Sequence, residues 1–200
     1  MASTVTELLR RRFGGKKDIL PSGYTQLKWL TSDARAWIDS GVLRSDDTSQ
    51  IIEMETDIIF NVYGVMQLIG TDNGCYWGID SKGNWCCDRV AGSTPMELNR
   101  AYHVKTVKTN VVGMSLFVDN SLVETSNRNI AGFSETVKLF CINRGYYILN
   151  GSMGHTKIFK AHELVRYFIP CINPNNIYGM FDLVTREFYT SASVYPFTGS

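Results

Sequence analysis

The sequence contains no apolar run that approaches the roughly 18 consecutive residues of a membrane-spanning helix. The arginines near its N-terminus are not followed by the apolar segment that a signal peptide requires. Since both signals are missing, we expect the chain to be made in a cytoplasm and to stay out of membranes. Any role at a surface would then depend on assembly with other proteins.

Cysteine pairs with metal-binding or redox spacing are also missing. No two of the five cysteines are separated by two residues, which excludes a zinc knuckle and a thiol-redox motif. Cysteine is readily buried, so we expect free and mostly buried thiols. The histidines are scattered, and we predict no catalytic dyad, no metal site and no cofactor. These residues are Cys75, Cys86, Cys87, Cys141, Cys171, His103, His155 and His162.

Sustained helical periodicity is absent after the first 15 residues. The chain shows instead about a dozen short, closely spaced segments in which apolar and polar residues alternate, with turns between them. The clearest runs from Ile51 to Phe60, where Glu53, Glu55 and Asp57 fall on one face. This pattern predicts an all-β sandwich or barrel. The 200 residues, 44% of them apolar, suffice for one such domain with a sizeable core.

The net charge is small, at +1, but the charged residues are unevenly distributed along the chain. Residues 1–17 hold five basic residues and one acidic residue, whereas residues 18–200 hold 15 basic and 18 acidic residues. We therefore divide the chain into a basic arm, residues 1–19, and a mildly acidic domain, residues 20–200. Basic arms can bind phosphates, but the domain offers no basic face. Nucleic acid is for this reason not the expected partner.

The arm also carries the signals of a short helix. Thr4 and Glu7 have the spacing of a capping box, and Gly14-Gly15 ends the segment. A helix of about eight residues is not stable alone in water, so we predict that it docks on a partner protein. A flexible basic tail is the alternative. The predicted anchoring residues are Thr4, Val5, Glu7, Leu8, Leu9, Arg10, Arg11 and Arg12.

The stretch from Leu164 to Tyr189 indicates three short strands separated by turns. The first is expected to stop at Pro170, which cannot donate a hydrogen bond to a ladder. The asparagine-rich segment 173–176 is a turn, and the hairpin after it has Thr185-Arg186 at its tip. We expect these strands to complete the two sheets of a sandwich.

Several stretches follow one another in an order and spacing that is typical of a single family. They are Leu20–Leu27, Ala36–Val42, Ile51–Glu55, Val118–Asn120, Val137–Asn143, Thr156–Phe159, Leu164–Cys171, Gly179–Val184 and Phe188-Tyr189. This set resembles the concanavalin A-like (laminin G-like) jelly-roll domains found in tailed-bacteriophage virion proteins and in surface proteins of gut bacteria. The resemblance covers about residues 20–198 and implies a jelly-roll β-sandwich of about a dozen strands, preceded by a short N-terminal helical arm.

The arm itself is similar to short leaders on phage fibre and capsid-decorating proteins. Together the two resemblances imply a non-enzymatic structural protein of the virion, a head or tail fibre or a capsid decoration. The arm would bind other virion proteins, and the lectin-like domain would contact host-surface glycans. A homo-oligomer is also implied, with a trimer favoured. The alternatives are a bacterial surface carbohydrate-binding module and a glycoside hydrolase or lyase.

The carboxylates of the clearest strand depart from the pattern of jelly-roll glycosidases. Such enzymes use the order Glu-x-Asp-x-x-Glu to hold a nucleophile and an acid/base. Here Glu53 and Glu55 are followed by Asp57 one position early, and Ile58 stands where the pattern needs a carboxylate. The pattern is broken, so we predict no catalytic residue and explain these side chains as a solvated sheet face.

An aromatic hairpin is the best surface candidate for glycan binding. Tyr76, Trp77 and Trp85 surround a Ser-Lys-Gly-Asn turn that also carries Asp80 and Asn84. Aromatic faces stack on the apolar faces of sugars, and polar side chains bind the hydroxyls. These five residues form the predicted glycan-binding site. The alternative is that the tryptophans belong to the core.

Two Asp-Asn pairs place hard oxygen ligands in turns, as a calcium site would. They are Asp72-Asn73 and Asp119-Asn120. Neither forms the dense acidic loop of an EF-hand. Turn formation by asparagine and aspartate explains both pairs better, so no calcium is predicted.

Overall fold

The computed structural model describes residues 19–44, 51–71, 74–88, 90–109, 113–127, 135–142 and 147–200. The predicted N-terminal helix and its anchoring residues from Thr4 to Arg12 lie outside these ranges. Asp72-Asn73, one of the two pairs weighed for calcium, does so too. No helix within the described ranges is long and apolar enough to cross a membrane.

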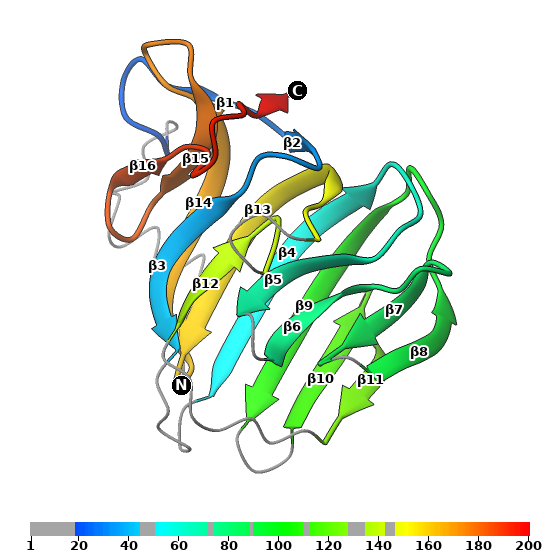
Figure 1. Ribbon diagram of the computed structural model, residues 1–200. Coiled ribbons are helices and arrows are strands. Elements are labelled where there is room, and N and C mark those ends of the chain that lie inside the picture. Colours follow the sequence, from blue (N-terminus) through cyan, green and yellow to red (C-terminus); the bar gives the residue numbers. More distant parts are fainter. Residues whose placement is uncertain are drawn as a thin grey trace.

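The described chain is a sandwich of two antiparallel sheets (Figure 1). The main path of the eleven-stranded large sheet runs β11 (Ser121–Ser126), β10 (Gly113–Val118), β9 (Ala101–Thr109), β4 (Ile52–Phe60), β13 (Asn150–Lys160), β14 (Glu163–Ile172), β15 (Tyr178–Asp182), β16 (Glu187–Tyr189). Off this path are β1 (Thr25–Gln26), β2 (Leu30–Asp33) and β17 (Thr198–Gly199). The six-stranded small sheet runs β3 (Ile38–Arg44), β12 (Glu135–Leu139), β5 (Met66–Thr71), β6 (Gly74–Ile79), β7 (Asn84–Cys87), β8 (Val90–Pro95).

The prediction of an all-β sandwich is thereby confirmed. The expectation that the strands between Leu164 and Tyr189 complete both sheets is wrong, because β14, β15 and β16 all belong to the large sheet. The seventeen strands of the described residues exceed the expected dozen because several are very short. β1 and β17 have two residues each and β16 has three, too few for an alternating pattern to mark them in the sequence.

Strand β4 shows how the alternating sequence produces the two layers. Successive side chains of a strand point to opposite faces, so the pattern separates apolar from charged residues. Ile52, Met54 and Ile58 are buried between the sheets, whereas Glu53 and Asp57 lie on the outer face of the large sheet. The predicted division of this strand is confirmed, and its outer face becomes a polar surface.

Strand β14 runs through Pro170 instead of stopping before it, so the predicted end of this strand is wrong. Pro170 lies opposite Met180 of β15, and its carbonyl accepts a hydrogen bond from the Leu27 N–H on its other side, at 2.9 Å. The nitrogen and carbonyl of one strand residue point to the same side. The ring nitrogen of Pro170, which carries no hydrogen, therefore faces Leu27, just past the end of β1. The ladder with β15 loses no donor.

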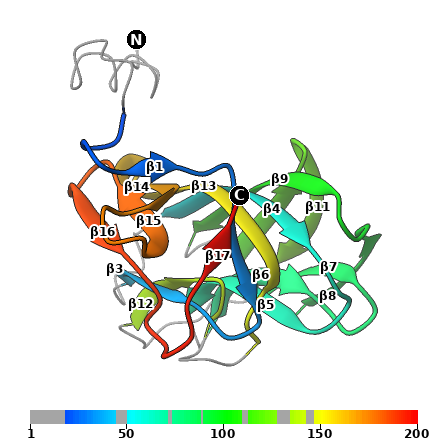
Figure 2. The ribbon, with the colours of Figure 1, turned by 90° about the horizontal axis from the view of Figure 1, so that it is seen from above.

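A second, smaller core lies on the outer face of β14 and β15. Leu20, Ile169, Cys171, Phe181 and Leu183 are buried there, and Tyr24, Tyr167 and Phe188 pack against them. We call the segment from Ile19 to Trp29 the strap, because it passes across the outside of the large sheet with β1 paired to β14 (Figure 2). Leu20 belongs to the strap, and its burial against this second core fixes the segment to the sheet.

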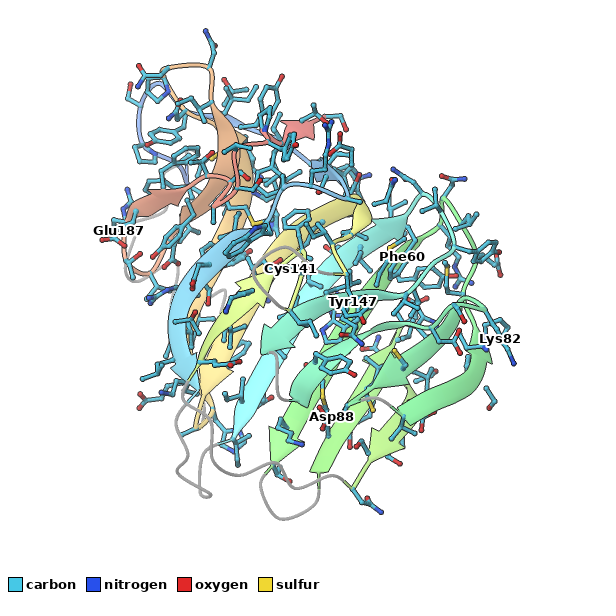
Figure 3. The ribbon with its side chains drawn as sticks, viewed as in Figure 1. Phe60, Lys82, Asp88, Cys141, Tyr147 and Glu187 are labelled. Atoms are coloured by element: carbon cyan, nitrogen blue, oxygen red, sulfur yellow. The ribbon has the colours of Figure 1, made fainter. Side chains whose placement is uncertain are left out.

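A buried ion pair joins the two sheets. The Lys108 ammonium on β9 lies 2.6 Å from the Asp88 carboxylate, just after β7, and the two side chains are 2% and 0% exposed. Asp88 is seen among the strands in Figure 3, away from the outline of the molecule. Desolvating two charges is costly, so this contact needs both partners present.

Candidate functional site

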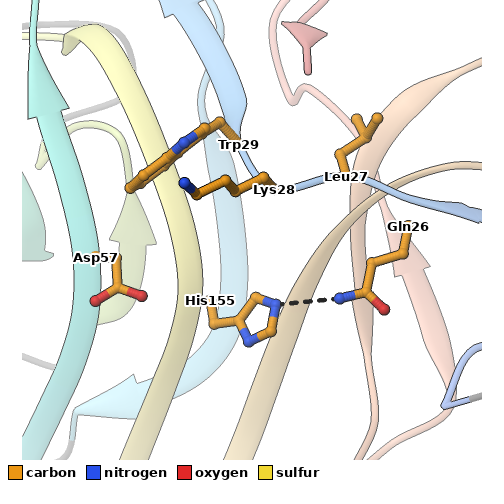
Figure 4. Close-up of a pocket in the computed structure, with 6 residues that line it drawn as sticks. All are labelled: Gln26, Leu27, Lys28, Trp29, Asp57 and His155. Carbon is orange, nitrogen blue, oxygen red and sulfur yellow. Dashed lines mark hydrogen bonds between the residues drawn. The ribbon is translucent and has the colours of Figure 1, made fainter. Parts of the chain in front are cut away.

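A groove opens where the strap crosses the outer face of the large sheet (Figure 4). It has a volume of about 480 Å³. The strap supplies one wall, and strands β4 and β13 supply the floor. The lining residues are Gln26, Leu27, Lys28, Trp29, Asp57 and His155.

Trp29 is the aromatic residue of this groove, and its position is fixed from two directions. Its N–H donates to the Ser200 carbonyl at 2.9 Å, and the Ser200 N–H donates to the Trp29 carbonyl at 3.1 Å. Its half-buried ring lies against Gly154, where an added β-carbon would come within 3.2 Å of Trp29 Cζ3. The Lys28 ammonium stands 5.7 Å from the ring centroid. The indole is thus held in place at the surface before any ligand arrives.

A β-bulge in β13 shapes the floor. Met153 pairs with Ile58 and Thr156 pairs with Thr56, so Gly154 and His155 together lie opposite the single residue Asp57. The extra residue changes the alternation, and His155 is directed to the outer face while Thr156 is buried. Bulges are frequent beside functional sites because they redirect a side chain in this way.

His155 is held by hydrogen bonds on both ring nitrogens. The Gln26 amide nitrogen lies 3.4 Å from Nε2, and the Tyr167 hydroxyl lies 3.3 Å from Nδ1. An amide nitrogen can only donate, so Nε2 accepts and Nδ1 carries the hydrogen that it donates to Tyr167. Burial lowers the pKa of His155, with a smaller contribution from Lys157 and partial compensation by Asp57. The imidazole is therefore neutral at pH 7.

Asp57 supplies a carboxylate to the groove. Its Oδ1 lies 2.9 Å from His103 Nδ1 on β9, and its side chain is 49% exposed. The groove thus combines an aromatic face with a carboxylate, an imidazole, an amide and an ammonium. Such a set suits a ligand that has one apolar face and several hydroxyls.

Beyond the groove, the charges of the outer face are joined in ion pairs. Lys105 lies 3.3 Å from Glu53 and 3.6 Å from Glu55, and Lys157 lies 3.3 Å from Glu55. His162 also contacts Glu53, at 2.5 Å. The two glutamates considered for glycosidase chemistry are therefore each bound to cationic side chains.

The predicted aromatic glycan site lies in a different place and is largely buried. Tyr76, Trp77 and Trp85 are 0%, 1% and 2% exposed. Trp85 packs edge-on against Phe60 and Tyr102, with ring centroids 5.6 Å and 5.2 Å apart. Because the core covers these rings, none can stack on a sugar, and the expectation of an exposed aromatic hairpin is corrected: the tryptophans belong to the core.

Asp80 and Asn84 remain in the turn between β6 and β7, next to Lys82 at the edge of the sandwich (Figure 3). Asp80 Oδ1 accepts hydrogen bonds from the Lys82 and Asn84 backbone N–H groups at 2.8 Å and 2.9 Å. Asp80 Oδ2 lies 3.3 Å from the Asn84 amide nitrogen. These two side chains stabilise their own turn, apart from the Trp29 groove.

Among the described residues, the other candidate ligands of the sequence are not gathered into a site. Asp119 and Asn120 have φ values of 49° and 67° and form the turn between β10 and β11, as the turn-former interpretation predicts. Within the described residues, no group of three or more histidine, cysteine, aspartate or glutamate side chains has the arrangement of a metal site.

The described cysteines are buried, as expected; they are Cys86, Cys87, Cys141 and Cys171. Burial raises the pKa values of Cys86, Cys87 and Cys171 to about 12. A thiol with so high a pKa is a poor nucleophile at neutral pH, so these residues act as small apolar side chains.

Comparison with known proteins supports the fold. No protein-family model and no curated protein sequence matches this chain. A solved structure of a proposed carbohydrate-binding protein from Bacteroides ovatus aligns with 88% of the chain at 14% identity and a TM-score of 0.60. The alignment covers 60% of that protein, so this chain spans less than two thirds of its length. What the two share is the fold.

Two further similarities are weaker. The carbohydrate-binding module CBM66 of Bacillus subtilis aligns with 71% of this chain over 93% of its own, at 14% identity and a TM-score of 0.39. A Trypanosoma rangeli sialidase aligns with 60% of this chain over 22% of its own, at 14% identity and a TM-score of 0.42. At these scores neither bears on how this chain works.

Proposed function

We propose that this chain is a carbohydrate-binding domain and that the groove beside Trp29 holds a sugar ring. The observation that carries the proposal is the half-buried indole, fixed at the surface beside polar side chains. The apolar face of a sugar would stack on Trp29, while Asp57 and His155 would bind hydroxyls on its rim. The fold shared with the Bacteroides protein and the resemblance to concanavalin A-like domains both support this role.

The position of Trp29 also favours binding energetically. A side chain that must be ordered on binding costs roughly 0.5–1.5 kcal/mol. The backbone bonds to Ser200 and the contact with Gly154 already order Trp29. Little of the stacking energy would therefore be lost to ordering the site.

The proposed domain binds without catalysing a reaction. Glu53 and Glu55 are engaged by Lys105, Lys157 and His162, which leaves neither carboxylate as a ready acid or nucleophile. Incubation of the protein with a panel of polysaccharides should release no reducing ends. Turnover that disappears in Glu53→Gln would contradict this part of the proposal.

The fold shared with the Bacteroides ovatus protein favours a carbohydrate-binding module, the first alternative to the virion role. None of the comparisons supports a phage fibre or decoration protein, virion partners or a trimer. The virion location and the anchoring role of residues Thr4 to Arg12 stay predictions, which deletion of residues 1–17 and a particle-incorporation assay would test.

Binding to a printed array of plant, bacterial and animal glycans tests the proposal. We expect the native chain to retain at least one glycan class and Trp29→Ala to weaken that binding at least tenfold, because the stacking surface is lost. Trp29→Tyr should restore part of it. Tyr63→Ala is the matched control, since Tyr63 is exposed but does not line the groove. No retained glycan, or equal binding by a folded Trp29→Ala, would contradict the proposal.

A further inference from the structure

A second cavity adjoins the Trp29 groove. It has a volume of about 420 Å³ and is bounded by residues 19–24 and by Gln26. Gln26 also lines the first groove, so one exposed side chain belongs to both. Each volume lies within the roughly 300–1,000 Å³ that single small-ligand sites occupy.

The wall of the second cavity is firmly held. The Tyr24 ring packs edge-on against Phe181 and Phe188 of the second core, with centroids 5.2 Å and 5.7 Å apart. The Tyr24 N–H donates to the Pro21 carbonyl at 3.2 Å, which closes a turn. Gly23 has a φ of +85°, a conformation that glycine adopts readily. The strap therefore presents a second aromatic residue from a fixed backbone.

We infer that the two cavities bind neighbouring units of one linear oligosaccharide, with Gln26 between them. This rests on the proposed function of the Trp29 groove. The Gln26 amide nitrogen donates a hydrogen bond to His155 Nε2. The side-chain carbonyl oxygen of Gln26 can then accept from a hydroxyl near the junction of two units. Trp29 lines one cavity and Tyr24 the other, so each unit meets an aromatic residue. The preferred ligand is thus a chain of at least two sugars.

Calorimetry with cello-, malto-, laminari-, xylo- and fructo-oligosaccharides of one to six units tests the inference. For a series that binds, we expect affinity to rise at least tenfold from the monosaccharide to the trisaccharide. Ser22→Trp should fill the second cavity and abolish that rise while changing monosaccharide affinity less than twofold. Thr25→Trp is the control, because Thr25 is also exposed on the strap but lines neither cavity.

The outcomes separate the two proposals. Equal affinity for one unit and for six, or the same chain-length dependence in Ser22→Trp and Thr25→Trp, would overturn the two-cavity inference and leave the Trp29 site intact. Tyr24→Phe keeps the ring contacts and should retain the chain-length dependence at least in part. If Tyr24→Phe lost that dependence completely while Ser22→Trp kept it, this arrangement would also be contradicted. Failure of every glycan on the array would overturn both.

Discussion

Asp182 shows how a single buried side chain organises the hairpin of β15 and β16. It has no exposed surface, and its carboxylate accepts hydrogen bonds from the Tyr167 N–H at 2.8 Å, the Val184 N–H at 3.0 Å and the Thr185 hydroxyl at 2.7 Å. Arg166 Nε lies 3.5 Å away. These partners replace the water that burial removes from the charge.

Replacing Asp182 should therefore destabilise the folded protein strongly. We expect Asp182→Ala to lower the free energy of unfolding by about 3–5 kcal/mol, since the partly buried Arg166 and several donors lose their acceptor. Urea denaturation measures the change. The control Glu163→Ala removes an exposed carboxylate from the start of β14 and should shift the free energy by less than about 0.5 kcal/mol. A change for Asp182→Ala as small as the control's would show that the network is dispensable.

His155 links the groove to pH. Burial lowers its pKa, so the native state resists protonation, whereas the unfolded chain takes up the proton near the ordinary value of about 6.5. Its contribution to stability is present above that value and is lost as the pH falls below it. We expect the unfolding temperature to fall more between about pH 7.5 and about pH 5.5 in the native protein than in His155→Gln. Identical slopes, or an imidazole that titrates above its ordinary pKa by NMR, would contradict this.

At the scale of elements, the β13 bulge determines where Trp29 lies. A β-carbon on Gly154 would meet Trp29 Cζ3 at 3.2 Å and Asp57 Cβ at 3.1 Å, so Gly154→Ala must displace one of them. We expect a shift in tryptophan fluorescence and at least a fivefold loss of glycan affinity. The control is Gly64→Ala, whose added carbon would meet only Met66 Cε, at 3.9 Å. Unchanged affinity in both variants would show that the indole tolerates movement.

The element that alternation predicts correctly is β4, whose residues are buried and part-exposed in strict turn. The hairpin of β15 and β16 is also anticipated, although four of the five residues of β15 are buried and its sequence does not alternate. β6 could not be interpreted in the same way, because the consecutive residues Tyr76 and Trp77 are both buried and alternation then says nothing about exposure. The aromatic hairpin was for this reason mistaken for a surface site.

The groove could not be predicted, because its parts meet only in the folded chain. Tyr24 to Leu30 alternates and predicts one strand, but the structure divides it into β1, which pairs with β14, and β2, which pairs with β13 and β17. These partners lie more than a hundred residues further along the chain. Trp29 falls between the two short strands, and no local pattern places it beside His155.

At the scale of the whole molecule, the Lys108–Asp88 pair couples the sheets. Asp88→Asn keeps a residue that tolerates the φ of 47° but removes the charge next to Lys108, so we expect a loss of about 3–5 kcal/mol in the free energy of unfolding. Adding Lys108→Met should recover much of it. Asp119→Asn is the control, with a similar φ of 49° but an exposed ion pair with Arg100, and should have little effect. Equal losses in the two single variants would contradict the prediction.

The backbone pairing of Ser200 with Trp29 has a consequence for how the protein should be handled. The Lys28 and Trp29 N–H groups both donate to the Ser200 carbonyl, at 2.8 Å and 2.9 Å, so anything attached after Ser200 sits within reach of the indole. An affinity tag or resin at that point would crowd the groove and weaken capture of a glycan. A small fluorophore at that position would instead report glycan binding, because its emission would change as the groove fills.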